Sequence, residues 1–437
     1  MKMLIYLTPW DESIKSSSLR YSFLKNDFKA VLKNLYFYCN KIKEDFEVRI
    51  ICPNSTEAGQ NDFSEPYITP NFINKKEINY IFSSHKEYMM SDSKNKKEEC
   101  ISFFKKKLDS FTPHIIIALT PCDFIKDLFP NSLYYVMEAG FFSRPPYPIT
   151  QYFDTNSPLN KTFPVQFKDQ ILKLDFNQKQ QNFITLIRSK YLKIFNKELS
   201  KKFISRKNLD PKNKYQYIVL LPLQFENCPS FDNCCDFSNQ EELAEFVLEN
   251  IDKDILLVVT KHDFTDIDTK NFIAKFSSKY NNFLFIENLG SINRYVSQYL
   301  VHLVDAVITV SSSIGLQAVF YNKPCICIGN SHIKSFADSY DIKDLSNLIS
   351  CKNNNTSNKD KLIYYLLTHY YVPFKFLKKK PKWTYDFFKK SMKKKINFKG
   401  EQRINFYDRI ENDGNLLKFY LKSRFASIIY YFYNMIK

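Results

Sequence analysis

Short apolar runs alternate regularly with amphipathic segments between residues 214 and 329. The runs are four to nine residues long and rich in β-branched residues, which predicts buried strands. The segments between them carry apolar residues at helical spacing, and Ser238 with Glu241 fits a capping box. Alternating strands and helices predict a parallel sheet covered by helices. The predicted strands are 215–223, 255–260, 283–286, 306–310 and 325–329, and the predicted helices are 238–251, 268–279, 291–304 and 314–321.

The first half shows a similar but looser rhythm, which predicts a second α/β domain. The polar stretch 200–214 is the best domain boundary. We therefore predict an N-terminal Rossmann-like domain (1–205), a C-terminal Rossmann-like domain (206–355) and a C-terminal helical region (356–437). In the first half the predicted strands are 3–8, 46–52, 114–120 and 132–137, and the predicted helices are 28–41, 97–110 and 179–199.

The C-terminal region interleaves aromatic residues with lysine runs, most densely in Phe374–Lys399. One interpretation is a basic amphipathic surface that binds an anionic bilayer. The other is a set of helices that pack back on the two domains, with their lysines in solvent. The two interpretations are compatible with each other.

Composition and charge limit the partners and the compartment. The 437 residues are 44% hydrophobic and carry a net charge of +17, which indicates a globular protein with an anionic partner. Nucleic acid ranks below a membrane or an anionic small molecule, because the sequence has no Arg-rich arm and no zinc-finger spacing. The ten cysteines form no CxxC pair, and no signal peptide or membrane-spanning run is evident. We expect a cytoplasmic protein, with the inner face of the cytoplasmic membrane as a candidate surface, and no metal site.

Three polar stretches follow predicted strands of the second domain, at the sheet edge where ligands bind in open α/β folds. Gln224 and Glu226 follow the first strand, and Lys261 and His262 follow the second. A turn that contains three serines and a glycine follows the fourth. The candidate site residues at this sheet edge are Gln224, Glu226, Lys261, His262, Ser311, Ser312, Ser313 and Gly315.

The turn Ser311–Gly315, called the serine turn from here on, contains one of only seven glycines in the chain. Unpaired N–H groups and the dipole at the start of the following helix favour an anion such as phosphate. The alternative is that one serine merely caps the helix. For Lys261 and His262, a fixed cation beside a titratable donor suits an anionic ligand, and the alternative is an ordinary polar loop.

A fourth polar stretch, Tyr134–Asn156, follows a strand of the first domain. Glu138 is expected in a turn, where a carboxylate can act as a general base toward an acceptor hydroxyl. The alternative is that Glu138 caps the turn or forms an ion pair. Arg144 follows it, and Asp154 is expected in a turn.

Several stretches of the chain resemble the motifs of a known protein family. The stretch DAVITVSSSIGLQAVFYNKPCICIG (Asp305–Gly329) is similar to a signature of the bacterial capsule polysaccharide biosynthesis proteins, which include β-Kdo transferases. LLPLQFEN, KHD and MEAGFFSRPPYPITQYFD resemble further motifs of that family, in the same order along the chain.

The resemblance implies a GT-B glycosyltransferase, with two Rossmann-like domains that face each other across a cleft. Ser311–Ser313 and Gly315 would hold the donor phosphate, and Gln224, Lys261 and His262 would line the same site. His262 is also a candidate catalytic residue, together with Glu138 and Glu226. Glu138 would be the carboxylate near the acceptor, with Arg144 on the acceptor side. The implied substrates are a nucleotide sugar, CMP-linked and carrying Kdo or another ulosonic acid, and a glycan or glycolipid acceptor. No cofactor or metal is implied.

One departure from the family pattern leaves the mechanism open. The family has acidic residues after its Gln-Val-Glu, where this chain has Asn227 and Cys228. A covalent route is therefore weakened, and an inverting enzyme with Glu138 or Glu226 as base, using a UDP- or GDP-sugar, is an alternative. A non-catalytic glycan- or membrane-binding assembly factor on a degenerate GT-B scaffold is another.

Overall fold

The chain divides into two compact units. Unit 1 comprises Met1–Ala139, Gln151–Pro158 and Tyr371–Arg403, and unit 2 comprises Gly140–Thr150, Leu159–Tyr370 and Ile404–Lys437. This division differs from the predicted boundaries at 205 and 355, because the chain passes between the units several times. The computed structural model describes residues 1–8, 20–54, 60–83, 85–119, 124–155, 161–224, 229–232, 234–262, 265, 267–290, 292, 294–351, 356–393 and 420–421.

Unit 1 is built on a seven-stranded sheet of order β12-β6-β5-β4-β1-β2-β3. Strands β5, β4, β1, β2 and β3 pair in parallel, and β6 runs antiparallel to β5. The central strands are almost completely apolar, as expected when helices cover both faces of a sheet. The strands are β1 (Lys2–Tyr6), β2 (Glu47–Pro53), β3 (Ile68–Ile73), β4 (Ile115–Ala118), β5 (Leu133–Ala139), β6 (Thr150–Asp154) and β12 (Val372–Pro373).

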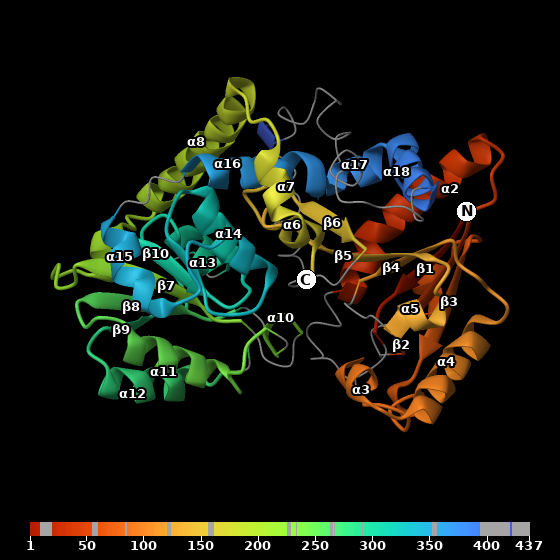
Figure 1. The fold of residues 1–437 in the computed structure, drawn as a ribbon, viewed down its shortest axis with the longest axis horizontal. Helices are drawn as coiled ribbons and strands as arrows, with labels where there is room; N and C mark the ends of the chain where they lie inside the picture. Colours follow the sequence, from red (N-terminus) through yellow and green to blue (C-terminus); the bar gives the residue numbers. More distant parts are fainter. Residues whose placement is uncertain are drawn as a thin grey trace. The chain divides into compact units, whose positions relative to one another are not determined.

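Helices cover both faces of this sheet (Figure 1). On one face, Tyr88, Phe104 and Phe124 pack with strand residues of one parity into a single core. On the other face, the ring of Phe387 contacts those of Tyr135 and Phe153. The first face carries α3 (His85–Met90), α4 (Lys94–Leu108) and α5 (Phe124–Leu128), and the second carries α2 (Lys29–Lys41), α17 (Phe374–Lys379) and α18 (Pro381–Lys393).

Unit 2 is built on a five-stranded parallel sheet of order β11-β10-β7-β8-β9. All five strands were predicted from the sequence, within a few residues at each end. The strands are β7 (Tyr217–Pro222), β8 (Ile255–Thr260), β9 (Phe283–Phe285), β10 (Ala306–Thr309) and β11 (Cys325–Cys327).

The helices of unit 2 also lie on both faces of their sheet (Figure 1). The apolar sides of α11 and α12 pack on the strands into one core. Helices α8, α13 and α14 lie on the opposite face, and the long helix α8 begins at a capping box in which Asn177 and Gln180 bond reciprocally. The helices of this unit are α6 (Phe163–Gln166), α7 (Lys168–Lys173), α8 (Gln178–Lys201), α9 (Arg206–Leu209), α10 (Pro229–Asp232), α11 (Gln240–Asn250), α12 (Thr269–Lys279), α13 (Val296–Leu300), α14 (Ser313–Phe320), α15 (Leu345–Ser350) and α16 (Thr356–Tyr365).

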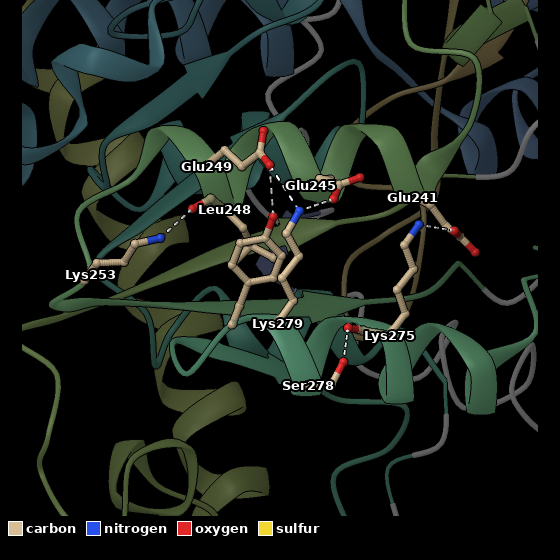
Figure 2. A network of polar contacts seen from close by, with 9 residues as sticks. Glu241, Glu245, Leu248, Glu249, Lys253, Lys275, Ser278 and Lys279 are labelled. Carbon is tan, nitrogen blue, oxygen red and sulfur yellow. Dashed lines mark hydrogen bonds and ion pairs between the residues drawn. The ribbon is translucent and has the colours of Figure 1, made fainter.

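Polar contacts between α11 and α12 lie outside this core (Figure 2). Lys279 pairs with Glu245 at 2.6 Å and with Glu249 at 3.3 Å, and Lys275 pairs with Glu241 at 2.9 Å. The hydrogen bond from Lys279 lowers the pKa of Glu245. Because the five side chains are between 32% and 53% exposed, the pairs contribute little stability compared with the apolar faces beneath them.

Three local predictions in unit 2 are wrong. The N-cap of α11 is Asn239, whose side chain accepts from the Glu242 N–H at 2.9 Å, so Ser238 is not the capping residue. The predicted helix 291–304 reduces to the five-residue α13. The predicted linker 200–214 contains α9, and Asp210 accepts backbone hydrogen bonds from Lys214 and Tyr215.

The C-terminal region contains helices, as predicted, and it contributes to both units. Helix α16 belongs to unit 2, whereas β12, α17 and α18 belong to unit 1. The buried Tyr420 donates its hydroxyl to the Leu367 carbonyl at 2.8 Å, within unit 2. No helix in the described ranges is both long and apolar enough to cross a bilayer. The predicted fold class is confirmed, since both units are α/β with largely parallel sheets, as in GT-B proteins.

Gly315 allows α14 to lie unusually close to the sheet. A Cβ atom at this position would lie 2.8 Å from Thr309 Cγ2 and 2.9 Å from Ile333 Cγ2, which is closer than carbon atoms approach without displacement. Thr309 ends β10, and the serine turn follows it directly. The close approach therefore fixes the position of the serine turn.

We predict that Gly315→Ala destabilises the protein by about 1–3 kcal/mol, because the added methyl overpacks the contact between α14 and β10. Thr309→Ser removes the Cγ2 atom but keeps the hydroxyl that accepts from the Ser312 N–H. The double variant should therefore recover part of the loss. Urea unfolding of the four proteins checks this, and strictly additive effects would contradict the proposed contact.

Candidate functional site

Three of the predicted polar stretches lie at one edge of the unit 2 sheet. Strands β10, β7 and β8 are neighbours and run parallel, so their carboxyl ends lie at the same edge. Ser311, Gln224 and Lys261 follow these three strands. Adjacent strands are about 4.8 Å apart, so the three stretches lie within reach of one small ligand.

Gln224 holds the serine turn in place. Its side-chain amide donates to Ser311 Oγ at 2.7 Å, and its carbonyl oxygen accepts from the Ser311 N–H at 3.0 Å. Its own N–H donates to Gln240 Oε1 at 3.0 Å. Both Gln224 and Ser311 are buried. Gln224 therefore positions the turn, a role that the sequence did not separate from ligand binding.

Ser312 and Ser313 form the start of α14. Ser312 is the N-cap: its hydroxyl accepts from the Ile314 N–H at 3.3 Å, and its own N–H donates to Thr309 Oγ1. In the part of the chain that the structure describes, neither the hydroxyl nor the N–H of the partly exposed Ser313 has a hydrogen-bond partner. Ser313 therefore offers two donors at the positive end of a helix dipole. The Gly315 N–H is used by the Ser312 carbonyl at 2.9 Å, so Gly315 contributes close packing here.

Lys261 and His262 differ in charge: the lysine has a carboxylate counter-ion, whereas the imidazole ring is neutral. Lys261 forms an ion pair with Glu287 and donates to Thr269 Oγ1 at 3.3 Å. His262 lies with its Nε2 atom 3.4 Å from Arg144 Nη2. Burial, and secondarily the Arg144 charge, lower the pKa of His262 to about 3. The imidazole is therefore uncharged at neutral pH.

Arg144 lies in unit 2, although it precedes that unit's sheet by some 70 residues. It belongs to the loop 140–150, which joins β5 to β6. Its guanidinium carbon lies 5.2 Å from the centre of the Tyr295 ring. Gln298 donates to the Pro145 carbonyl at 2.6 Å, and Gln317 donates to the Phe141 carbonyl at 3.3 Å. The loop is therefore built into the face that α13 and α14 cover.

Glu138 lies in unit 1, within β5 and not in the predicted turn. It pairs with Tyr152 on β6, is partly exposed, and accepts from the Ala139 N–H at 2.9 Å. Asp154, also predicted in a turn, is a buried residue of β6. Glu226, Asn227 and Cys228 lie outside the described residues.

Sequence reasoning missed the residues that hold the loop 140–150. Gln298 and Gln317 are at most 2% exposed, yet each lies among mostly apolar residues of its helix. A buried amide in such a segment must find hydrogen-bond partners, which is the signal that was available. Within the described ranges, no group of three or more His, Cys, Asp or Glu side chains is arranged to hold a metal ion.

Comparisons with known structures give several distant similarities. A β-Kdo 2,7 transferase, KpsC from Thermosulfurimonas dismutans, is 14% identical, with 66% of this chain and 87% of that chain covered and a TM-score of 0.39. The wall teichoic acid polymerase TagF, as its H444N variant, is 11% identical, with 91% and 90% covered and a TM-score of 0.28. A UDP-GlcNAc 2-epimerase from Methanocaldococcus jannaschii is 13% identical, with 84% and 99% covered and a TM-score of 0.32. No curated protein matches the chain.

A family model gives the more specific result. Residues 166–376 match the model described as capsule polysaccharide biosynthesis protein. The matched segment includes every predicted site residue except Glu138 and Arg144. The predicted resemblance to the capsule polysaccharide biosynthesis family is therefore confirmed over these residues, just under half of the chain.

Proposed function

We propose that this protein is a glycosyltransferase that moves a sugar from a nucleotide-activated donor to a capsule or other surface glycan. The observation that carries the proposal is the serine turn at the start of α14. Gln224 holds this turn at the same sheet edge as Lys261 and His262, inside the segment that matches the capsule family.

The serine turn supplies the donors that a phosphate group needs. The Ser313 hydroxyl and N–H lie ready at the positive end of α14, so a phosphate can bind there without rearrangement of the turn. Because His262 is uncharged at neutral pH, we propose that it contributes a hydrogen bond and not a positive charge. We favour a CMP-linked donor carrying Kdo or another ulosonic acid, with a UDP- or GDP-sugar as the alternative.

We assign the acceptor side to a carboxylate, Glu138 or Glu226. A carboxylate can take the proton from an acceptor hydroxyl as the new glycosidic bond forms. Because Asn227 and Cys228 stand in place of acidic residues, an inverting mechanism with one of these bases is an alternative to the retaining mechanism. Dependence of activity on such a carboxylate would distinguish an enzyme from a non-catalytic assembly factor on the same scaffold.

We further propose that unit 1 binds an anionic membrane surface through the exposed side of α2, α17 and α18. The three helices contain a single acidic residue, Asp386. Phe37 is 58% exposed on α2, and Ile42 is 39% exposed just after it. An exposed apolar group among lysines suits the headgroup region of a bilayer. The lysines, all exposed, are Lys33, Lys41, Lys43, Lys375, Lys379, Lys380 and Lys382.

We predict that Ser313→Asp weakens CMP binding at least tenfold, which corresponds to about 1.4 kcal/mol. A carboxylate at this position suits the helix dipole, so the fold should be retained, but it repels a phosphate. Asn239→Asp at the start of α11 is the matched control, since it adds the same charge at another helix N-terminus. Calorimetric titration with CMP, CDP and UDP measures the effect. Equal affinities in the two variants, or no nucleotide binding by the unaltered protein, would contradict the proposal.

We predict that Glu138→Gln lowers sugar transfer by about 10²-fold or more while nucleotide affinity stays unchanged, because only the proton acceptor is lost. Nucleotide release from CMP-Kdo, other CMP-ulosonates and UDP-sugars, with acceptor glycan present, measures this. Transfer at the unaltered rate would move the role to Glu226. Absence of transfer by the unaltered protein with every donor would favour the assembly factor.

We predict that Lys375→Glu with Lys379→Glu weakens binding to vesicles of mixed phosphatidylcholine and phosphatidylglycerol at least tenfold, because each lysine near such a surface contributes about 1 kcal/mol. Lys207→Glu with Lys212→Glu in unit 2 is the control with the same change in net charge. Phe37→Ser should also weaken binding without changing its salt dependence. Co-sedimentation with vesicles measures all three, and equal loss in both double variants would exclude this surface.

A further inference from the structure

Within the described residues, the positive charge of Arg144 has no counter-ion. Its side chain is partly buried, and its contacts in the described part of the chain are a histidine nitrogen and a tyrosine ring, with no carboxylate within ion-pair distance. Two other arginines of unit 2 do have carboxylate partners: Arg188 pairs with Asp360, and Arg206 pairs with Asp305 at 2.7 Å. A partly buried guanidinium without a counter-ion is costly, and a bound anion removes that cost.

The neighbour of Arg144 cannot supply the missing charge. Because the pKa of His262 is lowered to about 3 by burial and by Arg144, its ring is neutral at physiological pH. Arg144 Nη2 lies 3.4 Å from His262 Nε2 and can only donate, so Nε2 accepts and Nδ1 carries the ring proton. The guanidinium has five N–H donors, and this contact uses one of them.

The position of Arg144 is set by the loop that carries it. The Tyr147 ring stacks on Phe142 with the centroids 4.2 Å apart, and the Tyr147 hydroxyl lies 2.6 Å from the Tyr321 hydroxyl. Next to Arg144, the Pro145 carbonyl accepts from Gln298. The contact between Tyr147 and Tyr321 is buried, the bond from Gln298 is partly buried, and all of these contacts lie within unit 2. Arg144 is therefore held in place before any ligand binds, which lowers the entropic cost of binding.

We propose that Arg144 binds an oxyanion of the donor substrate and so acts on the donor side, not on the acceptor side that the sequence suggested. The inference rests on the proposed function and names one more residue of the same site. His262, which Arg144 contacts, directly follows Lys261 at the carboxyl end of β8, two strands from the serine turn. The planar fork of an arginine binds the two oxygens of a phosphate or a carboxylate together.

Two groups of the donor have this chemistry. One is the phosphate of the nucleotide, and the other is the carboxylate of an acidic sugar such as an ulosonic acid. Both are oxyanions that the Arg144 fork fits. Titration with CMP, with free Kdo and with cytidine distinguishes them, because cytidine carries neither group.

We expect Arg144→Gln to weaken binding of CMP, of free Kdo, or of both at least tenfold, while cytidine binding stays unchanged. Arg144→Lys should recover only part of the loss, because it restores the charge without the fork. Arg206→Gln is the matched control, since it removes an arginine of the same unit that already has a carboxylate partner. Loss of CMP affinity assigns Arg144 to the phosphate, and loss of Kdo affinity assigns it to the sugar carboxylate.

A second measurement does not depend on turnover. Binding of an oxyanion at Arg144 should raise the pKa of His262, because a negative charge beside the ring favours its protonated form. Histidine ring NMR signals, titrated with and without CMP or Kdo, measure this shift. If Arg144→Gln binds both oxyanions as the unaltered protein does, the assignment of Arg144 is overturned while the proposed function stands. If the unaltered protein binds neither CMP nor any other nucleotide, both are overturned.

Discussion

The close approach of α14 to the sheet is the constraint on which the proposed donor site depends. Gly315, one of the seven glycines in the chain, makes it possible, and Gly329 allows a second close contact at Val310, beside the serine turn. A Cβ at Gly315 would lie 2.8 Å from Thr309 Cγ2, and a Cβ at Gly329 would lie 2.6 Å from Val310 Cγ1. The serine turn lies between these contacts, with Gln224 bonded to it from β7. Its donors are consequently fixed by the core, as electrostatic recognition of a phosphate requires.

The loop 140–150 adds a residue from the first half of the chain to this fixed arrangement. Strands β5 and β6 on either side of the loop belong to the unit 1 sheet, whereas the loop itself packs in unit 2. Buried amides of Gln298 and Gln317 bond its backbone, so the attachment is polar as well as apolar. Specific hydrogen bonds of this kind fix the register of the loop, which hydrophobic contacts alone would leave adjustable.

The sequence predicted the parts of the fold that follow from local patterns. The five strands of unit 2 are continuous apolar runs, and their parallel order places Gln224, Lys261 and Ser311 at one edge. The sequence could not predict contacts between segments that lie far apart along the chain. Arg144 meets His262 across 118 residues, and no local pattern records that contact. The turn predicted at Glu138 is wrong because β5 continues through it to pair with β6, a strand that the sequence did not reveal.

Whether each basic side chain has a carboxylate partner says more about ligand binding here than the net charge of +17 does. Lys261, which the sequence favoured as the cation of the site, has Glu287 as a counter-ion, so binding an anion there requires breaking or sharing an ion pair. His262 is neutral because burial opposes its protonation. Among the described residues, Arg144 is the one of these three whose positive charge has no carboxylate partner, and its loop is hydrogen-bonded in place. The proposed attraction for a donor oxyanion therefore centres on Arg144, which the sequence analysis assigned to the acceptor side.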